Sequence, residues 1–263
     1  MQADAKVALE AARSGAAVVR EGFLSGPDTR LKGSVNPVTA VDDRAEEAIF
    51  AALSRLCPGE KVLGEESGGA EWDADRVWIV DPLDGTVNFI HGMPHVSVSV
   101  AVWERGAPVA GVVIDVTRRE EFTAAAGGST RLNGETVSVS RQADASASLV
   151  VTGFPYDRQE HAHEYASTVG EVLSRVQGVR RLGSAALDFA WVACGRFDGY
   201  WEYELGPWDA AAGVLLVEGA GGRVTDHAGS GYDLGSRTVL ATNGLIHEEL
   251  SRLVTDHLPA HLR

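Results

Sequence analysis

The chain has 263 residues, of which 44% are hydrophobic and 23% charged, and its 37 acidic and 23 basic side chains give a formal net charge of −14. This composition excludes a disordered chain, and the acidic excess argues against non-specific binding to nucleic acid, which requires a basic surface. No run approaches the roughly 20 apolar residues of a transmembrane helix, and the charged N-terminal segment does not resemble a signal peptide. Two distant cysteines, Cys57 and Cys194, do not indicate a disulfide framework. We therefore expect a soluble cytoplasmic protein that binds neither membranes nor nucleic acid.

The first half of the chain predicts helices followed by an antiparallel sheet. Residues 4–23 and 42–56 have apolar side chains at helical spacing, with a polar stretch between them. Residues 77–80 form an apolar run typical of a buried strand, and residues 95–103 alternate with valines on one face. Turn signals near residues 105–108 and 132–135 separate further short strands, so we expect an antiparallel meander.

The second half predicts alternating strands and helices. Strands are expected at 149–151 and 179–182 and near Tyr200, Val224 and Val239, and helices at 160–176, 184–194, 209–218 and from about residue 245. Such alternation is typical of a layered α/β unit. No low-complexity linker separates the halves, so we expect one unit over residues 1–263, with an α+β lobe over 1–140 and an α/β lobe over 141–263.

The most informative segment is residues 78–86, Trp-Ile-Val-Asp-Pro-Leu-Asp-Gly-Thr. The proline favours extended backbone at Asp81, which we place at the end of the strand, where α/β proteins bind ligands. Asp81 and Asp84 flank the carbonyl of Leu83, and hard cations such as Mg²⁺ prefer such oxygen ligands. The alternative is a hydrophilic turn without a ligand.

Gly85 permits a tight turn, and Thr86 is expected to begin a short helix. The backbone amides of both residues could then bind an anion beside the carboxylates.

Three further segments are each weak alone. Residues 64–67, Gly-Glu-Glu-Ser, place Glu65 in a loop where acidic residues are usually solvated. Asp209 follows Trp208 at a predicted helix start, where a simple N-cap would explain it. Lys32 lies in a polar stretch that leads to Asp42.

In this order, the four segments resemble the inositol monophosphatase family of Mg²⁺-dependent phosphatases. The similarity covers nearly the whole chain, from Lys32 to residues 222–226, and the three motifs at 64–67, 78–89 and 208–213 are specific in combination. The resemblance implies a layered αβαβα sandwich, a homodimer and inhibition by lithium.

The resemblance also implies the ligands of two Mg²⁺ ions and a weaker third. Glu65, Asp81 and the main-chain oxygen of Leu83 would bind the first ion, and Asp81, Asp84 and Asp209 the second. A water bound to metal would attack the phosphate, oriented by three catalytic residues, Glu65, Thr86 and Asp42. Lys32 would lie in a mobile loop over the site.

The substrate implied by the resemblance is inositol monophosphate, because residues 87–94 resemble the inositol branch of the family. The residues implied to bind substrate are Asp84, Gly85, Thr86, Gly183, Ser184, Ala185, Glu202 and Asp209. Gly206 stands where animal members carry histidine, so we expect a more open pocket there.

Two alternative functions stay open. An enzyme of the same superfamily could act on histidinol phosphate, fructose 1,6-bisphosphate or a nucleotide 3′-phosphate. Some bacterial relatives associate with the transcription machinery, so the chain could act as a binding partner.

Other patterns point to no further site. His161 and His163 lie two residues apart on a predicted helix, hence on different faces, and are expected to be solvated.

Overall fold

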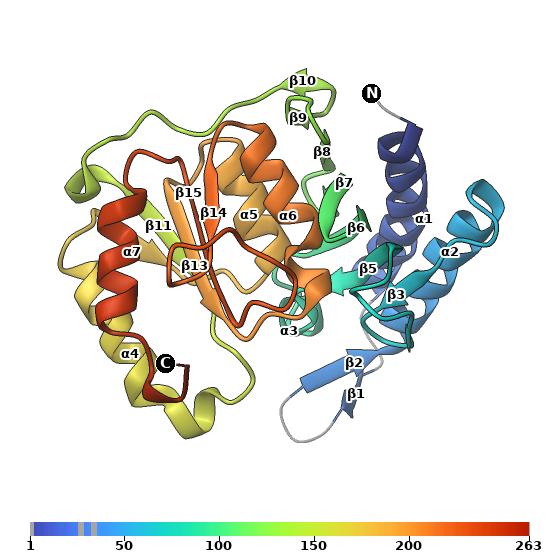
Figure 1. The fold of residues 1–263 in the computed structure, drawn as a ribbon. Helices are drawn as coiled ribbons and strands as arrows, with labels where there is room; N and C mark the ends of the chain where they lie inside the picture. Colours follow the sequence, from blue (N-terminus) through green and yellow to red (C-terminus); the bar gives the residue numbers. More distant parts are fainter. Residues whose placement is uncertain (1–2, 26–28, 33–35, 263) are drawn as a thin grey trace.

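The computed structural model describes residues 3–25, 29–32 and 36–262 (Figure 1). The larger of its two main sheets has eight strands in the order β10-β9-β8-β7-β6-β5-β3-β4. These strands are β3 (Val62–Gly64), β4 (Gly68–Gly69), β5 (Arg76–Asp84), β6 (Ser97–Glu104), β7 (Ala107–Asp115), β8 (Glu120–Ala125), β9 (Arg131–Leu132) and β10 (Glu135–Thr136). Strands β5 to β10 pair antiparallel in chain order, which confirms the meander.

The second sheet has five strands in the order β12-β11-β13-β15-β14. Its strands are β11 (Leu149–Thr152), β12 (Gly178–Arg180), β13 (Gly199–Tyr203), β14 (Arg223–Thr225) and β15 (Thr238–Thr242). Strand β11 pairs parallel with both β12 and β13, so three strands end at the same edge of the sheet.

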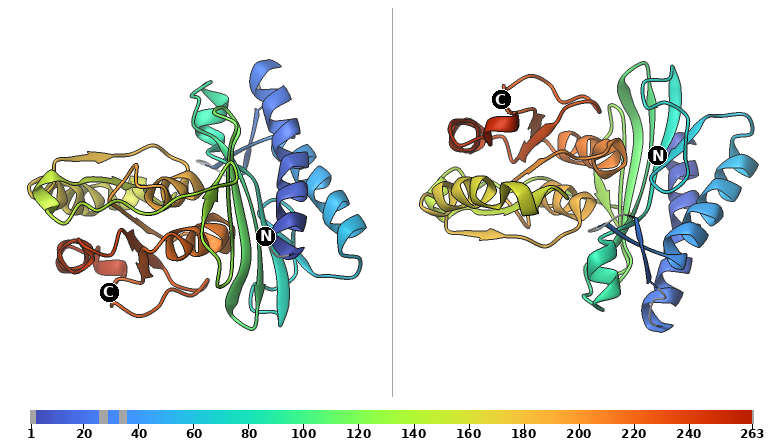
Figure 2. Two further views of the ribbon diagram at one scale, coloured as in Figure 1. Left: turned by 90° about the horizontal axis from the view of Figure 1, so that it is seen from above. Right: turned by 90° about the horizontal axis from the view of Figure 1, so that it is seen from below.

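Helices separate and cover the two sheets, and Figure 2 shows the resulting layers. The helices are α1 (Ala3–Ser25), α2 (Ala40–Leu56), α3 (Thr86–Ile90), α4 (Arg158–Leu173), α5 (Ala185–Ala193), α6 (Pro207–Gly219) and α7 (His247–Asp256). Helices α1 and α2 cover one face of the larger sheet, α5 and α6 lie between the sheets, and α4 and α7 cover the outer face of the second sheet. This is the expected αβαβα sandwich.

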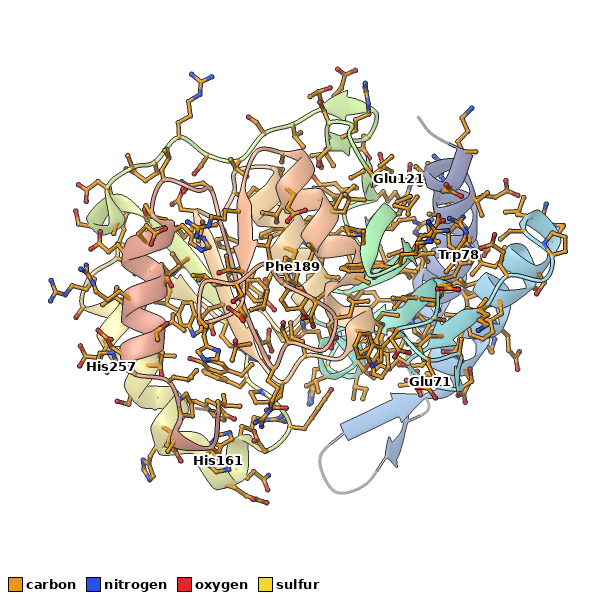
Figure 3. The ribbon with its side chains drawn as sticks, in the orientation of Figure 1. Glu71, Trp78, Glu121, His161, Phe189 and His257 are labelled. Carbon is orange, nitrogen blue, oxygen red and sulfur yellow. The ribbon has the colours of Figure 1, made fainter. Side chains whose placement is uncertain are left out.

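Three hydrophobic cores lie between these layers, and each of Trp78, Phe189 and Trp201 is buried in a different one. Figure 3 labels Phe189 on α5, in the middle of the molecule, and Trp78 in the part covered by α1. Burial of apolar side chains from both sheets and all layers is the main force that holds the sandwich together. No helix in the described ranges is long and apolar enough to cross a membrane.

The central helix α6 approaches the larger sheet closely because small residues meet there. A Cβ on Gly111 of β7 would lie 2.9 Å from the Cα of Ala212, so only glycine fits between strand and helix. The indole of Trp103 donates to the carbonyl of Ala211 at 2.9 Å. The hydroxyl of Ser99 on β6, which is opposite Asp81 of β5, donates to Trp208 O at 3.4 Å, and this contact brings the start of α6, which carries Asp209, to the end of β5.

The structure adds to the sequence predictions in three places. The polar stretch after α1 contains a hairpin, β1 (Thr29–Lys32) and β2 (Asn36–Thr39). The strand predicted at 77–80 continues to Asp84, because Asp84 pairs with Ser97 beyond an irregularity in the ladder. Strand β6 is buried on both faces: its small residues Ser97, Ser99 and Ala101, which mimic an exposed face in the sequence, lie under α5 and α6.

The other predicted helices are present with small shifts: the helix predicted at 160–176 is α4 and ends earlier, at Leu173. The division into lobes near residue 140 stays a prediction.

Candidate active site

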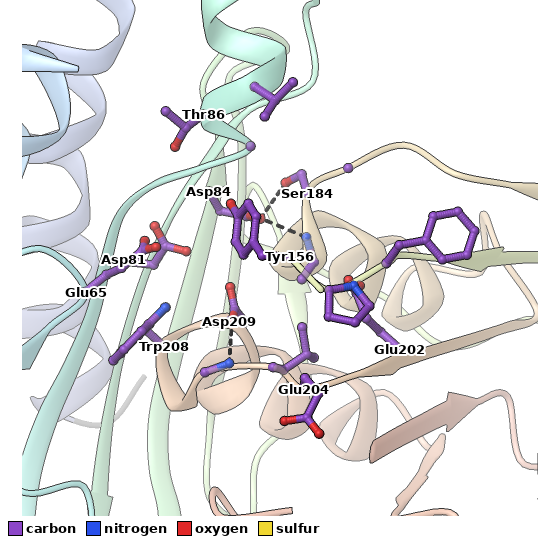
Figure 4. Close-up of a pocket in the computed structure, with 18 of the residues that line it drawn as sticks. Glu65, Asp81, Asp84, Thr86, Tyr156, Ser184, Glu202, Glu204, Trp208 and Asp209 are labelled. Carbon is purple, nitrogen blue, oxygen red and sulfur yellow. Dashed lines mark hydrogen bonds between the residues drawn. The ribbon is translucent and has the colours of Figure 1, made fainter. Parts of the chain in front are cut away.

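A pocket of about 370 Å³ lies where the end of β5 meets the first turns of α5 and α6 and the edge of the second sheet. Figure 4 shows its acidic residues from separate elements converging on one space. One carboxylate oxygen from each of Asp81, Asp84 and Asp209 lies within 4.8 Å of the others. Two come from β5, where the ladder irregularity lies between them, and the third comes from α6. The family resemblance predicted that these three aspartates share one site, and the structure brings them together.

Asp84 is held by four donors. Ser184 Oγ at 2.5 Å, Ser97 Oγ at 3.0 Å and the amide of Ala186 at 2.9 Å donate to Oδ2, and the amide of Ala185 donates to Oδ1 at 3.2 Å. The two amides belong to the first turn of α5, whose dipole favours a carboxylate. Ser184 and Ala185, expected to contact substrate, therefore also fix a carboxylate of the cluster.

Asp81 and Asp209 are fixed by their own turns. The amide of Leu83 donates to Asp81 at 3.0 Å, and the amide of Gly206 donates to Asp209 at 2.7 Å in a capping interaction at the start of α6. The N-cap of α6 is Gly206, and Asp209 is the third residue of the helix and accepts the amide of Gly206, so the simple N-cap explanation is wrong. The carboxylate of Asp209 lines the pocket.

Glu65 lines the same pocket on the turn after β3, and its amide donates to Val80 O at 3.1 Å. The buried carboxylate of Glu46 in α2 holds this turn, because it accepts the amides of Glu66 and Ser67 at 3.0 Å each. A Cβ at Gly64 would lie 2.1 Å from the same carboxylate. Sequence reasoning missed Glu46, since nothing in a helical pattern marks which acid turns inward.

The carboxylates repel one another. Burial raises the pKa of Asp81 well above its usual value, and the charges of Glu65, Asp84 and Asp209 raise it further. Burial also raises the pKa of Asp209, with Glu65 and Asp84 adding to the effect. A divalent cation would offset this repulsion, and carboxylates beside a backbone carbonyl such as Leu83 O are the donor set that hard cations prefer. The residues present therefore fit a metal.

Thr86 begins α3, as predicted, and its hydroxyl lies between two acceptors. It is 3.2 Å from Asp42 Oδ1 and 3.1 Å from Leu83 O. Asp42 is itself oriented by Thr39, whose amide and hydroxyl donate to Oδ2 at 2.9 and 2.6 Å. A hydroxyl has one proton, so binding of a cation at Leu83 O would leave the proton for Asp42.

Gly85 and Gly183 bring the two halves of the chain together at the pocket. Gly85 has φ +91°, and a Cβ there would lie 3.2 Å from Gly183 O. The side-chain amide of Asn88 donates to the carbonyls of His95 at 2.9 Å and Leu182 at 2.8 Å. Asn88 thus joins α3 to the segment before α5.

Glu202 lies on the side of the pocket away from Glu65 and Asp81 (Figure 4). Burial raises its pKa to about 7, although the hydroxyl of Tyr200 donates to it at 2.6 Å. A Cβ at Gly153 would lie 2.0 Å from the carboxylate, so glycine makes room for it. A buried acceptor at this place can select a ligand that carries a hydroxyl group.

The expectation of a more open pocket at Gly206 stays a prediction. A Cβ at Gly206 would lie 2.6 Å from the ring of Trp208, which fills the space that a side chain would take.

Comparisons with known proteins agree with this geometry. A sequence model described as the inositol monophosphatase family matches residues 1–259. The chain belongs to the inositol monophosphatase family. It is 40% identical to the Nus factor SuhB of Pseudomonas aeruginosa over the full length of both chains. It is 44% identical to the inositol-1-monophosphatase of Synechocystis sp., over 82% of this chain and 75% of that protein.

The fold agrees as well. The crystal structure of the extragenic suppressor protein suhB from Bartonella henselae is similar with a TM-score of 0.90 and 36% identity, over 96% of this chain and 98% of that one. Members of the inositol monophosphatase family are metal-dependent phosphatases, and the acidic cluster described above could hold the metal.

Sequence reasoning missed one wall of the pocket of this family member. Tyr156 and Arg158 follow β11, and Arg181 follows β12; all three line the pocket. No motif marks them, because they meet only where the parallel strands end together. Lys32, expected over the site, ends β1, and its side chain lies outside the described part of the structure.

The sequence predicted a solvated His161, but its ring contacts a second histidine. Its ring stacks on that of His261 with centroids 3.7 Å apart and planes 23° apart, beside Asp157 (Figure 3 labels His161). One possible ligand atom from each of Asp157, His161 and His261 lies within 4.8 Å of the others, and this group does not line the pocket described above.

Proposed function

We propose that this phosphatase is Mg²⁺-dependent and hydrolyses inositol monophosphate to inositol and phosphate. The observation that carries the proposal is the convergence of Asp81, Asp84 and Asp209 within 4.8 Å, in a pocket that also contains Glu65 and the buried Glu202. The first four residues suit a cation and the last suits a hydroxyl.

Two to three Mg²⁺ ions are part of the proposal. Glu65, Asp81 and Leu83 O would hold one, Asp81, Asp84 and Asp209 a second, and a weaker third would lie near Glu65. When bound, Mg²⁺ neutralises phosphate oxygens and makes water a better nucleophile at neutral pH. The repulsion among the carboxylates supports at least one divalent ion, because Asp81 and Asp84 are buried, Asp209 is half-buried, and negative charges this close require compensation.

The protein groups would orient the attacking water. Glu65 can accept one of its protons, and Thr86 can fix its position through the hydroxyl that Asp42 orients at 3.2 Å. The amides of Gly85 and Thr86 are placed to bind the phosphate, since the left-handed conformation of Gly85 begins α3 there.

The alcohol part of the substrate would face Glu202. Substrate binding here would involve Gly183, Ser184 and Ala185 from the segment that enters α5. Histidinol phosphate, fructose 1,6-bisphosphate and nucleotide 3′-phosphates are the alternative substrates.

The experiment is a turnover panel. Phosphate release from inositol 1-phosphate, histidinol phosphate, fructose 1,6-bisphosphate and adenosine 3′,5′-bisphosphate is compared with Mg²⁺, with a chelator, and with added lithium. We expect inositol 1-phosphate to be hydrolysed only when Mg²⁺ is present, and we expect lithium to inhibit this hydrolysis. Turnover that a chelator leaves unchanged would refute the metal mechanism.

A second candidate function is that of a partner of the transcription machinery, which the similarity to a protein named as a Nus factor favours. This second function predicts that the chain co-purifies with RNA polymerase and that the Asp84→Asn variant does so equally well.

The expected homodimer is tested by light scattering of the purified chain.

A further inference from the structure

We propose that Asp157, His161 and His261 form a second metal site, outside the pocket, that binds a divalent transition-metal ion such as Zn²⁺. One possible ligand atom from each residue lies within 4.8 Å of the others. Imidazole nitrogen suits Zn²⁺, Cu²⁺ or Ni²⁺, whereas Mg²⁺ prefers carboxylate, carbonyl and water oxygens. The site therefore differs in chemistry from the acidic cluster, and the inference goes beyond the proposed function and does not rest on it.

The site joins the start of α4 to a short helix near the end of the chain. Asp157 is the N-cap of α4, and the amide of His161 donates to its carbonyl at 3.3 Å, so one helical turn separates the two residues. His261 lies in the 3-10 helix η2 (Ala260–Leu262), and Figure 1 shows this segment beside the start of α4. The rings of His161 and His261 are stacked, so the fold already holds the two imidazoles in contact.

The spacing between His261 and Asp157 fits a tetrahedral ion. Nε2 of His261 lies 3.5 Å from Oδ2 of Asp157. Two ligand atoms that are each about 2.1 Å from a tetrahedral Zn²⁺ are about 3.4 Å apart. A direct hydrogen bond between an imidazolium and a carboxylate is shorter, about 2.8 Å. The two atoms are therefore too far apart for a strong direct bond and have the separation of ligands that share an ion.

The other neighbour of Nε2 of His261 is also an oxygen atom. The hydroxyl oxygen of Tyr165 is 3.2 Å from this nitrogen, and the hydroxyl donates to Oδ1 of Asp157 at 2.8 Å. Because a hydroxyl has one proton, Tyr165 has none left for the imidazole. Nε2 of His261 thus faces two oxygen acceptors, an arrangement that a cation between them would satisfy.

Glu164 lies at the other nitrogen of both rings. Its Oε1 is 3.0 Å from Nδ1 of His161, and its Oε2 is 3.9 Å from Nδ1 of His261. Oε2 also accepts the amide of Ala260 at 2.8 Å, which holds η2 against α4. Histidines that bind metals usually donate their second N–H to a carboxylate, which fixes the tautomer. Glu164 is placed for this role, and it leaves Nε2 of each ring for the ion.

A rotation of the His161 ring completes the ligand set. The two ring planes are 23° apart, and a turn about the Cβ–Cγ bond of His161 directs its Nε2 toward the ion. This torsion is broad for histidine, and the ring is only partly buried, so the rotation meets little resistance. A divalent charge would also offset the carboxylates of Asp157 and Glu164.

The test is calorimetric titration of the full chain with Zn²⁺ in excess Mg²⁺. We expect one Zn²⁺ to bind to the wild-type protein and equally well to Asp84→Asn, which weakens the acidic cluster. His161→Gln and His261→Gln should each lower the affinity at least about 10-fold, since loss of a carboxylate behind a ligand already costs that much. His163→Gln is the matched control, because His163 is exposed on the same helix, and it should bind as the wild-type protein does.

Three outcomes would overturn the site: no binding of Zn²⁺ by the wild-type protein, wild-type affinity in His161→Gln and His261→Gln, or binding that excess Mg²⁺ abolishes. Thermal unfolding gives a second measurement, because an ion that binds only the folded chain raises Tm. Zn²⁺ should raise Tm of the wild-type protein and of His163→Gln, but not of His261→Gln.

Unfolding in a chelator shows whether a substitution harms the fold itself. If His261→Gln has a lowered Tm there, Glu164→Gln gives the same test, because it keeps all three ligands and should bind Zn²⁺ about 10-fold more weakly. Wild-type affinity in Glu164→Gln would then refute the site. Phosphate release is not measured, so the result does not depend on whether inositol 1-phosphate is hydrolysed.

Discussion

The two sides of the pocket are built in opposite ways. On the metal side, Asp81, Asp84 and Asp209 are buried or nearly so and lie on a strand and a helix start, each fixed by at least one hydrogen bond. On the opposite side, Tyr156 and Arg181 are exposed and lie on segments that follow strand ends. The difference teaches that the acidic cluster is built on rigid elements, whereas part of the opposite wall lies on connecting segments that can vary without disturbing the core.

The largest expected effect is on the metal side. Asp84→Asn keeps the shape of the side chain but removes one negative charge from the cluster, and we expect a loss of at least about 10²-fold in kcat. Phosphate release at saturating Mg²⁺ measures it. The control is Asp73→Asn, an exposed aspartate, which should have the wild-type rate. A near-normal rate for Asp84→Asn would mean that this carboxylate is not a ligand.

The next largest effect concerns the orientation of the attacking water by Thr86 rather than the charge of the acidic cluster. Thr86→Val removes the hydroxyl that lies 3.2 Å from Asp42, and we expect kcat to fall about 10-fold, near the lower end for a hydrogen bond to a carboxylate. Thr86→Ser keeps the hydroxyl and should recover most of the rate. If the serine variant loses as much rate as the valine variant, the hydroxyl alone does not account for the loss.

Glu202→Gln tests the opposite side. We expect kcat/KM for inositol 1-phosphate to fall about 5-fold because one acceptor for a substrate hydroxyl is weakened, whereas turnover of p-nitrophenyl phosphate, which has no such hydroxyl, should be nearly unchanged. Tyr200→Phe, which removes the donor at 2.6 Å, should act in the same direction but less. Equal losses for both substrates would mean that Glu202 acts together with the acidic cluster and not on the alcohol part of the substrate.

The sequence predicted the metal side well and the opposite side poorly. Asp81, Leu83, Asp84 and Thr86 are close in the chain, so a short motif describes their geometry, and a helix start is readable at Asp209. The layered fold was also predictable, because apolar spacing follows the period of each element.

The remaining features depend on contacts between distant segments. Glu46 supports the Glu65 turn from another element, 20 residues away from the amide it accepts. Arg158 and Arg181 meet because β11 and β12 are parallel neighbours, which local pattern does not encode. The alternation in β6 does not show that its second face is buried as well, because the small residues there pack against α5 and α6.

The smallest expected effect concerns Asp188, near the side of the pocket that carries Glu202. Asp188 of α5 is buried, and neither of its carboxylate oxygens has a hydrogen-bond partner in the described structure. Burial raises its pKa well above the usual value, and Glu202 and Asp84 raise it further. The folded protein therefore keeps a proton that the unfolded chain loses near pH 4, so the free energy of unfolding should fall as pH rises above about 4.

Asp188→Asn replaces this carboxyl with a neutral group of the same shape. We expect urea unfolding in a chelator to show a flatter pH dependence than the wild-type protein, and a variant that is about 1 kcal/mol more stable near pH 8. Asp73→Asn should follow the wild-type curve. If the free energy of unfolding of Asp188→Asn has the same pH dependence as that of the wild-type protein, the carboxyl of Asp188 has a hydrogen-bond partner in solution. This wall of the pocket would then be as fully hydrogen-bonded as the acidic cluster.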